Sequence, residues 1–418
     1  MQFEQTLLSG GLMVITHSSP HLESVSLGAF VNAGSRQETA LNHGVAHFLE
    51  HLLFKGTQNR TANEIATQIE VLGSDINAFT STDMTAVHAT GLASHGGQSI
   101  EIIGDMITHS LFASPDIGLE SGVILQEISR NADSPNNVMH DVIQAVSYPG
   151  QSLGRTILGS TEFVAHAVTE DFHDFTTRQY TADNIVIAGA GGIDHDVFVR
   201  NVEAAFVDLP RTVRRQPIPR AAYVGGIGID RNRDFKQVSA GIAFDSVPII
   251  DDTMYHHILL ADAFGGGMSS PLFNEVREKR GLVYSTGCHT SMGADNGRLL
   301  ITGGMTAENV EEFVVVACRA FRTMCDHVDA IDLRRAKNSY LVGLATLRER
   351  PYAAACFMAR SYWQRGRVRS LAEMRDAINA VTLNDLKAAA ARVLTSEPSI
   401  ALIGPAPQAD YKALVCSA

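Results

Sequence analysis

The stretch VSLGAFVNAGSRQET, residues 25–39, has a counterpart 213 positions later in VSAGIAFDSVPIIDDT, residues 238–253. Both begin with an apolar run and end in polar, turn-forming residues, which is typical of a buried strand. The same offset separates VTEDFHDFTTRQYTADNIVIAGAGG at Val168 from VTLNDLKAAAARVLTSEPSIALIGPA at Val381, and each predicts a helix followed by a short strand. Two matches at one offset favour an internal duplication, although Val-Thr before a helix is also a common capping pattern.

The segment between the two copies, VDLPRTVRRQPIPRAAYVGG, contains three prolines, four arginines and no apolar period, and it predicts an exposed linker. We therefore expect an N-terminal domain over residues 1–207, a linker over 208–224 and a C-terminal domain over 225–418. Strand-like runs such as SVSLGAFVNAG and MTAVHATGLAS are mixed with amphipathic helices such as ANEIATQIEVLG, without strict alternation. The predicted fold class is α+β, with a mostly antiparallel sheet packed with helices in each domain.

Composition excludes several classes of protein. A chain of 418 residues with 45% hydrophobic and 19% charged residues is typical of a globular protein with two or more domains. The net charge of −12 argues against nucleic-acid binding, because phosphates require a basic surface. Five cysteines without a C-x-x-C pair predict reduced thiols and a cytoplasmic location. The first twenty residues predict no signal peptide, and no apolar stretch reaches the roughly 20 residues of a membrane span.

Two histidines and a glutamate occur together in NHGVAHFLEHLLFKGT, residues 42–57. His47 and His51 are four residues apart and Glu50 lies between them, so a helix would present all three on one face. Two imidazoles at this spacing can bind one zinc ion, and the glutamate can act as a general base toward water. The order is the inverse of the zincin motif. A chance match occurs in roughly one such chain in a few tens, and we expect His43 to be a bystander.

A catalytic zinc site needs a third protein ligand and one open position. The helix-like run DIGLESGVILQEISRNADSP, residues 116–135, contains two acidic residues in an apolar stretch, Glu120 and Glu127. They are seven residues apart and therefore share one helix face. The alternative interpretation is a solvated helix face, and the spacing alone leaves both open.

The motif GSRQE…GVAHFLEHLLFKGT resembles the pitrilysin family of inverzincin metallopeptidases, which includes the mitochondrial processing peptidase, and the resemblance covers nearly the whole chain. Family members place the third zinc ligand 76 positions after the second histidine, which is Glu127 here, and an accessory acidic residue seven positions earlier, which is Glu120. The resemblance implies a zinc endopeptidase with one zinc ion per chain. It assigns the metal to His47, His51 and Glu127, with Glu50 as general base and Glu120 supporting His51.

The resemblance also explains the duplication, since the family's active unit is two similar domains of which the first keeps the metal motif. Where the first half has HGVAHFLEHLLF, the second half has HHILLADAFGGG, without the ligands. The glycine run 265–267 lacks the lysine of a phosphate-binding loop, and its role is left open. The family's second domain contributes an arginine and a tyrosine to the substrate, and Arg277 and Tyr284 match their spacing. The alternative is a surface charge and a strand core residue.

Residues 73–91, GSDINAFTSTDMTAVHATG, predict a strand with a polar lead-in. The resemblance implies that NAFT within it is an edge strand on which substrate lies as an added strand, so Asn77, Ala78 and Phe79 are expected to bind substrate. Family members enclose peptides or unfolded segments in a closed chamber. The acidic net charge would favour basic peptides such as targeting presequences.

Because one chain contains both the zinc half and the Arg–Tyr half, the resemblance implies a homodimer acting on peptide substrates. The competing hypothesis is a non-catalytic or regulatory partner subunit of a processing-peptidase-like complex. Such subunits lack part of the zinc set, whereas this chain has all of it.

Overall fold

The computed structural model describes residues 3–215, 217–231 and 234–418. The chain forms two compact units, each built around one sheet. Unit 1 consists of Met1–Ile128, Arg155–Ile218 and Ala345–Leu371, and unit 2 consists of Ser129–Gly154, Pro219–Leu344 and Ala372–Ala418. Each unit thus takes one segment from the opposite half of the sequence, in addition to the two contiguous halves that the duplication predicts.

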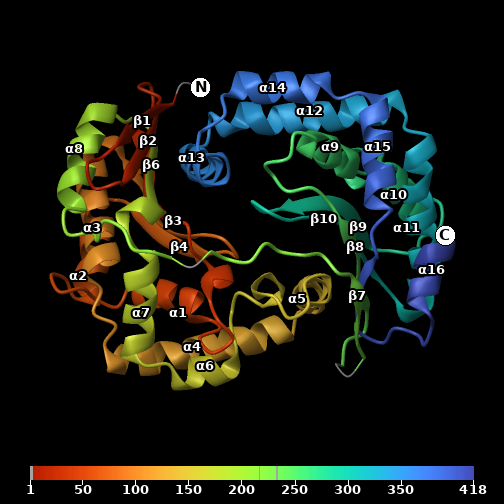
Figure 1. Ribbon diagram of the computed structural model, residues 1–418, viewed down its shortest axis with the longest axis horizontal. Helices are drawn as coiled ribbons and strands as arrows, with labels where there is room; N and C mark the ends of the chain where they lie inside the picture. The colour runs from red at the N-terminus through yellow and green to blue at the C-terminus, as the bar shows by residue number, and fades with distance from the viewer. Residues whose placement is uncertain (1–2, 216, 232–233) are drawn as a thin grey trace. The chain divides into compact units, whose positions relative to one another are not determined.

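The sheet of unit 1 has six strands in the order β1-β2-β6-β3-β5-β4 (Figure 1). The strands are β1 (Glu4–Leu7), β2 (Met13–Ser18), β3 (Ser24–Val31), β4 (Asp75–Thr80), β5 (Thr85–Leu92) and β6 (Ile185–Gly191). Only the β2–β6 pairing is parallel among them, so the predicted α+β class with a mostly antiparallel sheet is confirmed. The prediction of one strand over residues 73–91 is wrong, because the turn from Ser81 to Met84 divides the segment into the antiparallel pair β4 and β5.

The sheet of unit 2 repeats this order without the first strand, as β7-β11-β8-β10-β9. Its strands are β7 (Gly226–Asp230), β8 (Val238–Asp245), β9 (Ser285–Met292), β10 (Gly297–Met305) and β11 (Ser399–Ile403). Val186 of β6 is paired with Met13 and Phe30, and Ser399 of β11 is paired with Gly226 and Ala243. Each member of the second set lies 213 positions after its counterpart. The two sheets therefore share strand order and, at these pairings, register, which supports the duplication.

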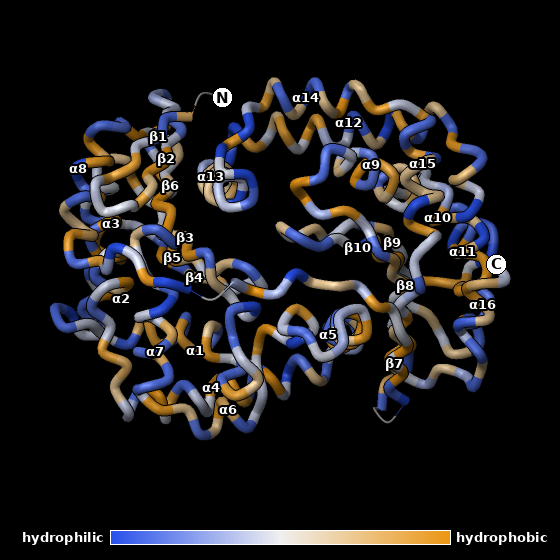
Figure 2. The backbone as a smooth tube through the Cα atoms, viewed as in Figure 1, coloured by the Kyte–Doolittle hydropathy of each residue, from blue (hydrophilic) through white to orange (hydrophobic). Residues whose placement is uncertain are grey.

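Helices cover both faces of the first sheet. One face packs against helices of the first half, including α1 (Val45–Leu52), α3 (Gly96–His109) and α7 (Thr169–Gln179). The other face packs against α13 (Pro351–Arg365), which comes from the second half of the sequence (Figure 1). Burial on both faces explains why β3 and β6 are apolar along most of their length, as the orange segments in Figure 2 show.

The second sheet is covered by a helix from the first half in the same way. α5 (Pro135–Ser147) places Val138, Met139 and Ile143 on Ala243, Leu300 and Ala401 of the second sheet. α5 and α13 occupy equivalent places in the two halves, since each follows a long helix, α4 (Ser114–Ala132) or α12 (Ala330–Leu347). The exchange of one helix in each direction is therefore a symmetric consequence of the duplicated chain.

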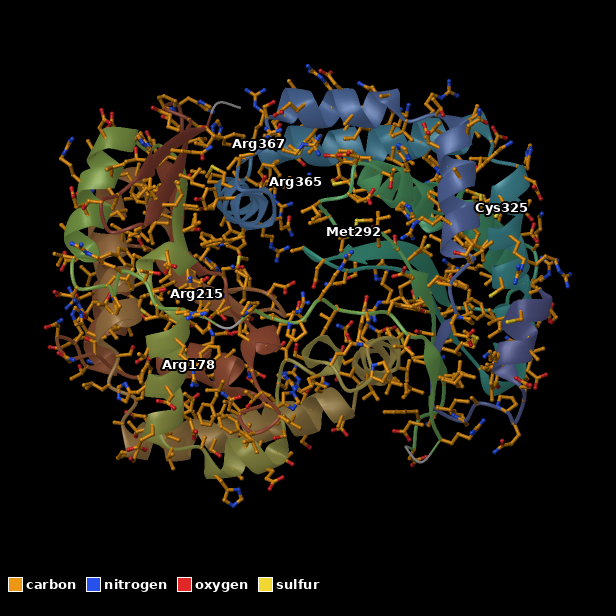
Figure 3. All side chains as sticks on the ribbon, in the orientation of Figure 1. Arg178, Arg215, Met292, Cys325, Arg365 and Arg367 are labelled. Carbon is orange, nitrogen blue, oxygen red and sulfur yellow. The ribbon has the colours of Figure 1, made fainter. Side chains whose placement is uncertain are left out.

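The predicted linker, residues 208–224, contains no helix or strand in its described part, and the division between the units falls inside it. Its first part is held on unit 1, because Arg215, labelled in Figure 3, donates to Thr181 at 2.8 Å and to Asp183 at 2.5 Å. Of the helices formed by described residues, none is long and apolar enough to cross a membrane.

Candidate zinc site

The start of α1 is fixed by a buried carboxylate. Both oxygens of Glu38 accept hydrogen bonds from the helix start, from Gly44 N at 2.9 Å and Ala46 N at 3.0 Å. Gly44 has φ 113° and packs against Gly159, where an added Cβ on either glycine would lie within 3 Å of the other's Cα. Burial raises the pKa of Glu38 to about 8, and the two backbone hydrogen bonds oppose that rise. The bonds satisfy two N–H groups that a helix start leaves unpaired, so Glu38 fixes where the helix begins.

One face of α1 is core and the other is polar. Val45, Phe48, Leu49 and Leu52 are buried against the first sheet and α7, with Phe48 packed edge-on to Phe172 at 5.0 Å. This apolar set leaves the side chains at positions 47, 50 and 51 on the remaining face. The predicted helix over the His-x-x-Glu-His motif is therefore present, and packing determines its orientation.

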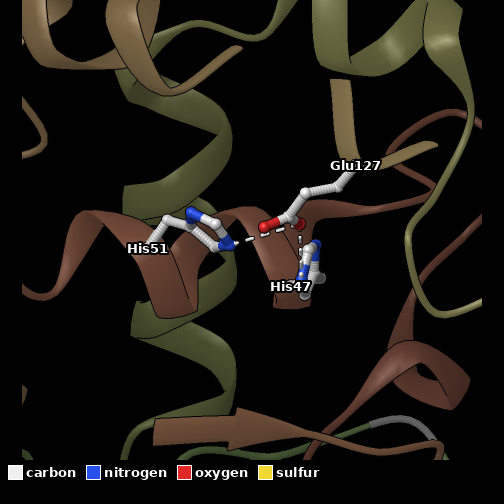
Figure 4. Close-up of side chains that lie close together, drawn as sticks. All are labelled: His47, His51 and Glu127. Carbon is white, nitrogen blue, oxygen red and sulfur yellow. Dashed lines mark ion pairs between the residues drawn. The ribbon is translucent and has the colours of Figure 1, made fainter. Parts of the chain in front are cut away.

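α4 supplies the third candidate ligand (Figure 4). The Nε2 atoms of His47 and His51 each lie 3.7 Å from Oε2 of Glu127, and the three potential ligand atoms all lie within 4.8 Å of one another. The side chains of His47 and His51 are 12% and 18% exposed, whereas Glu127 is 40% exposed. The two imidazoles are therefore shielded, and the carboxylate is open to solvent.

Glu120 orients His51. Its Oε2 accepts from Nδ1 of His51 at 2.9 Å, and its Oε1 pairs with Nζ of Lys55 at 2.5 Å. Burial alone would raise the pKa of Glu120, but the hydrogen bonds and charges of Lys55 and His51 lower it below its usual range. With Nδ1 donating to a carboxylate, the Nε2 lone pair of His51 faces His47 and Glu127, which is the tautomer that a metal ligand needs.

His47 is held neutral by its surroundings. Burial and the nearby His51 lower the pKa of His47 to about 4, so a proton does not compete for its ring nitrogen at neutral pH. Its Nδ1 is buried without a hydrogen-bond partner among the described residues, while its Nε2 faces Glu127. Two imidazole nitrogens and a carboxylate oxygen in this arrangement fit the donor set of a catalytic zinc ion.

Glu50 lies beside these ligands without belonging to the three. Its Oε2 accepts a hydrogen bond from the Thr80 hydroxyl at 2.6 Å. Burial raises the pKa of Glu50, and the Thr80 hydrogen bond opposes that rise. A raised pKa suits a carboxylate that must take up a proton and later release it.

The other predicted residues occupy defined places in the two units. Asn77, Ala78 and Phe79 lie on β4, which is an edge strand, and Ala78 faces the α1 side while Phe79 faces α13. In unit 2, the Arg277 guanidinium stacks over the Phe273 ring at 4.8 Å, and Tyr284, just before β9, is 80% exposed. The roles assigned to these residues stay predictions.

The glycine run 265–267 has a packing explanation at its first residue. An added Cβ on Gly265 would lie 2.6 Å from Cys288 on β9, so only glycine allows this approach. His43, predicted to be a bystander, directs Nε2 to the Thr156 carbonyl at 2.8 Å.

Three neighbours of the site were missed by sequence reasoning: Glu38, Lys55 and Thr80. Lys55 is four residues after His51, but α1 ends at Leu52, so helical periodicity does not place it beside Glu120. Thr80 lies 30 residues from Glu50 on another element. Glu38 and Lys55 belong to the quoted motif GSRQE…GVAHFLEHLLFKGT and Thr80 belongs to the NAFT segment, but neither segment predicts the contacts that these residues make.

The chain is similar in sequence to a known family and to its members. Residues 13–161 match the family model described as Insulinase (Peptidase family M16), and residues 167–340 match Peptidase M16 inactive domain. An uncharacterized zinc protease of Rickettsia felis is 31% identical over 404 residues, covering 96% of this chain and 98% of the relative. Another, of Streptomyces coelicolor, is 33% identical over 418 residues, covering 96% of this chain and 89% of the relative.

Solved structures share the fold. A protease from Helicobacter pylori gives a TM-score of 0.89 at 18% identity over 97% of this chain and 100% of that chain. A peptidase M16 inactive domain from Pseudomonas fluorescens gives 0.90 at 19% identity over 98% and 99%. The matched family model and the zinc-protease relatives show that the protein is a zinc metalloprotease. The full-length relatives and both family models place it more closely, and the chain belongs to peptidase family M16.

Proposed function

We propose that the protein is a zinc endopeptidase that hydrolyses peptides or unfolded segments, with one zinc ion per chain held by His47, His51 and Glu127. The observation that carries the proposal is the convergence of these three ligand atoms within 4.8 Å, beside Glu50. A zinc ion in such a site acts as a Lewis acid and lowers the pKa of water.

The chain's own residues would then transfer protons, orient a ligand and contact the substrate. Glu50, partly buried and next to the ligands, takes the proton of the attacking water and passes it to the leaving amine. Glu120 keeps His51 in the tautomer with a free Nε2. The family resemblance assigns Tyr284 a hydrogen bond to the developing oxyanion and Arg277 a contact with a substrate carbonyl.

The substrate would lie along β4. This strand pairs with β5 on one side and is the last strand of its sheet, so its other edge is available for an extended peptide. Backbone pairing along Asn77, Ala78 and Phe79 would hold the peptide with little dependence on its sequence. Such recognition needs an extended chain and excludes folded proteins.

The assembly and the preferred substrate follow from the same proposal. Family resemblance favours a cytoplasmic homodimer with closed chambers, and the net charge of −12 favours basic, presequence-like peptides. A basic fluorogenic peptide and its acidic counterpart test the preference, and the salt dependence of their ratio tests its electrostatic origin.

The proposed function is tested by comparing the wild type with Glu50→Gln for bound zinc and for cleavage of a basic peptide. We expect both proteins to bind close to one zinc ion per chain, and the variant to lose about 10²- to 10⁴-fold in kcat. A wild type that binds zinc and cleaves no peptide would support the partner-subunit hypothesis. An unchanged rate in Glu50→Gln would show that Glu50 is not the base.

A further inference from the structure

The hydroxyl of Thr80 makes a short contact with the general base. Thr80 is the last residue of β4, and its Oγ1 lies 2.6 Å from Oε2 of Glu50 and 3.5 Å from the Ala46 carbonyl. A hydroxyl has one proton to donate, and the shorter distance to a carboxylate makes Glu50 its acceptor. We propose that Thr80 is a positioning residue, which holds Glu50 in the orientation for proton transfer and connects the base to the substrate strand.

The hydrogen bond leaves the two carboxylate oxygens of Glu50 unequal. Oε2 is engaged by Thr80, so Oε1 becomes the oxygen that accepts the proton of the attacking water. A glutamate has three rotatable side-chain bonds, and a fixed donor on one oxygen removes much of this freedom before substrate arrives. Preorganisation of this kind is worth more in a shielded site than in water, because little solvent competes for the carboxylate.

Thr80 also lies where the substrate would be bound. Its backbone is paired with Thr85 of β5, so its position is fixed by the sheet and not by the helix that bears Glu50. A peptide added to the open edge of β4 would therefore align on the same strand that orients the base. This step rests on the proposed function. The proposed role accounts for a hydroxyl side chain at Thr80, the polar residue of the Asn-Ala-Phe-Thr segment that contacts α1.

The test removes the hydroxyl and keeps the shape of the side chain. In Thr80→Val we expect a 10- to 100-fold lower kcat on a basic fluorogenic peptide with KM changed less than threefold, and in Thr80→Ser a kcat within about threefold of the wild type. Thr90→Val is the matched control. Thr90 is on β5 opposite Asp75 and bonds Ser26, about 17 Å along the sheet from Thr80.

Two further measurements separate positioning from a structural role. The zinc content of Thr80→Val should equal that of the wild type. In a Glu50→Gln background the Thr80→Val change should lower the rate no further, because the two residues act as one unit. The inference is overturned if Thr80→Val cleaves at the wild-type rate, if Thr80→Ser is as slow as Thr80→Val, or if the two losses multiply. A wild type without peptidase activity would instead overturn the proposed function, and this inference with it.

Discussion

The two halves of the chain contain the same helix pair with opposite chemistry. In the first half, α1 and α4 carry five polar residues that meet at the candidate site. In the second half, α9 (Met254–Gly265) and α12 take the equivalent places. The residues 213 positions after His47, Glu50, His51, Glu120 and Glu127 are Leu260, Ala263, Phe264, Leu333 and Tyr340.

The second set is an ordinary core. Leu260, Ala263 and Phe264 are 0% exposed, and the Tyr340 ring packs edge-on to Tyr255 at 5.8 Å. The same backbone arrangement thus accepts either an apolar cluster or a group of imidazoles and carboxylates. Where the polar set is present, burial raises the pKa of Glu50 and lowers that of His47, which indicates that function there opposes stability.

The largest effect on zinc binding and activity is expected when His47 is replaced by leucine, the residue type of its second-half counterpart Leu260. His47→Leu should reduce bound zinc to under about a tenth per chain and peptidase activity by more than about 10³-fold, because two ligands cannot hold the ion at a catalytic site. Metal analysis and a peptide assay check this. His166→Leu, at an exposed position, is the control and should keep its zinc. Full zinc in His47→Leu would mean that the metal binds elsewhere.

Exchanging Glu50 and its counterpart Ala263 should change the free energy of unfolding in opposite directions in the two halves. Ala263→Glu should lower the unfolding free energy by about 3 kcal/mol, because it buries an unpaired carboxylate. Glu50→Ala should raise it at pH 7, since the raised pKa of Glu50 means that the ionised form is penalised in the folded state. Thermal unfolding with a chelator present measures both. Changes of the same sign would contradict the comparison.

A smaller effect is expected from the residue that supports His51. Glu120→Leu reproduces the second-half residue Leu333 and removes the acceptor of the His51 Nδ1 proton. Zinc affinity should fall about 10- to 100-fold, measured by competition with a chromogenic chelator. Glu120→Gln keeps a hydrogen-bond acceptor, so its zinc affinity should fall less than that of Glu120→Leu. Equal affinities in the wild type and Glu120→Leu would leave Glu120 without a role at the metal.

The smallest effect is expected at Lys55. Lys55→Met removes the ion pair with Glu120 but keeps the hydrogen bond from His51, so zinc affinity should fall only about two- to fivefold. The same chelator competition, repeated at high salt, measures it. Since Lys55 is 36% exposed, salt should weaken the wild type toward the variant. If Lys55→Met lowered the zinc affinity as much as Glu120→Leu does, Lys55 would act on the metal site by more than its ion pair with Glu120.

Prediction from sequence succeeded where the signal was local or repeated. The spacing of His47, Glu50 and His51 needs only the period of a helix, and the 213-residue offset needs only two copies of one pattern. Glu127 required the family resemblance, because its neighbour on the same face is Glu120 and the spacing does not rank them. Thr80 and Lys55 lie in the quoted segments, but their contacts with Glu50 and Glu120 depend on packing and could not be predicted from those segments.

The sequence by itself determined the duplication, the α+β class and the residue types of the metal group, because helical and strand periods are short-range properties written in neighbouring residues. Only the tertiary structure decided that α5 and α13 each cover the sheet built mainly from the other half, and that Thr80 of β4 contacts Glu50 on the polar face of α1. These contacts join residues from 30 to more than 200 positions apart. They form because both faces of each sheet must be buried, and no local pattern specifies which helix does it.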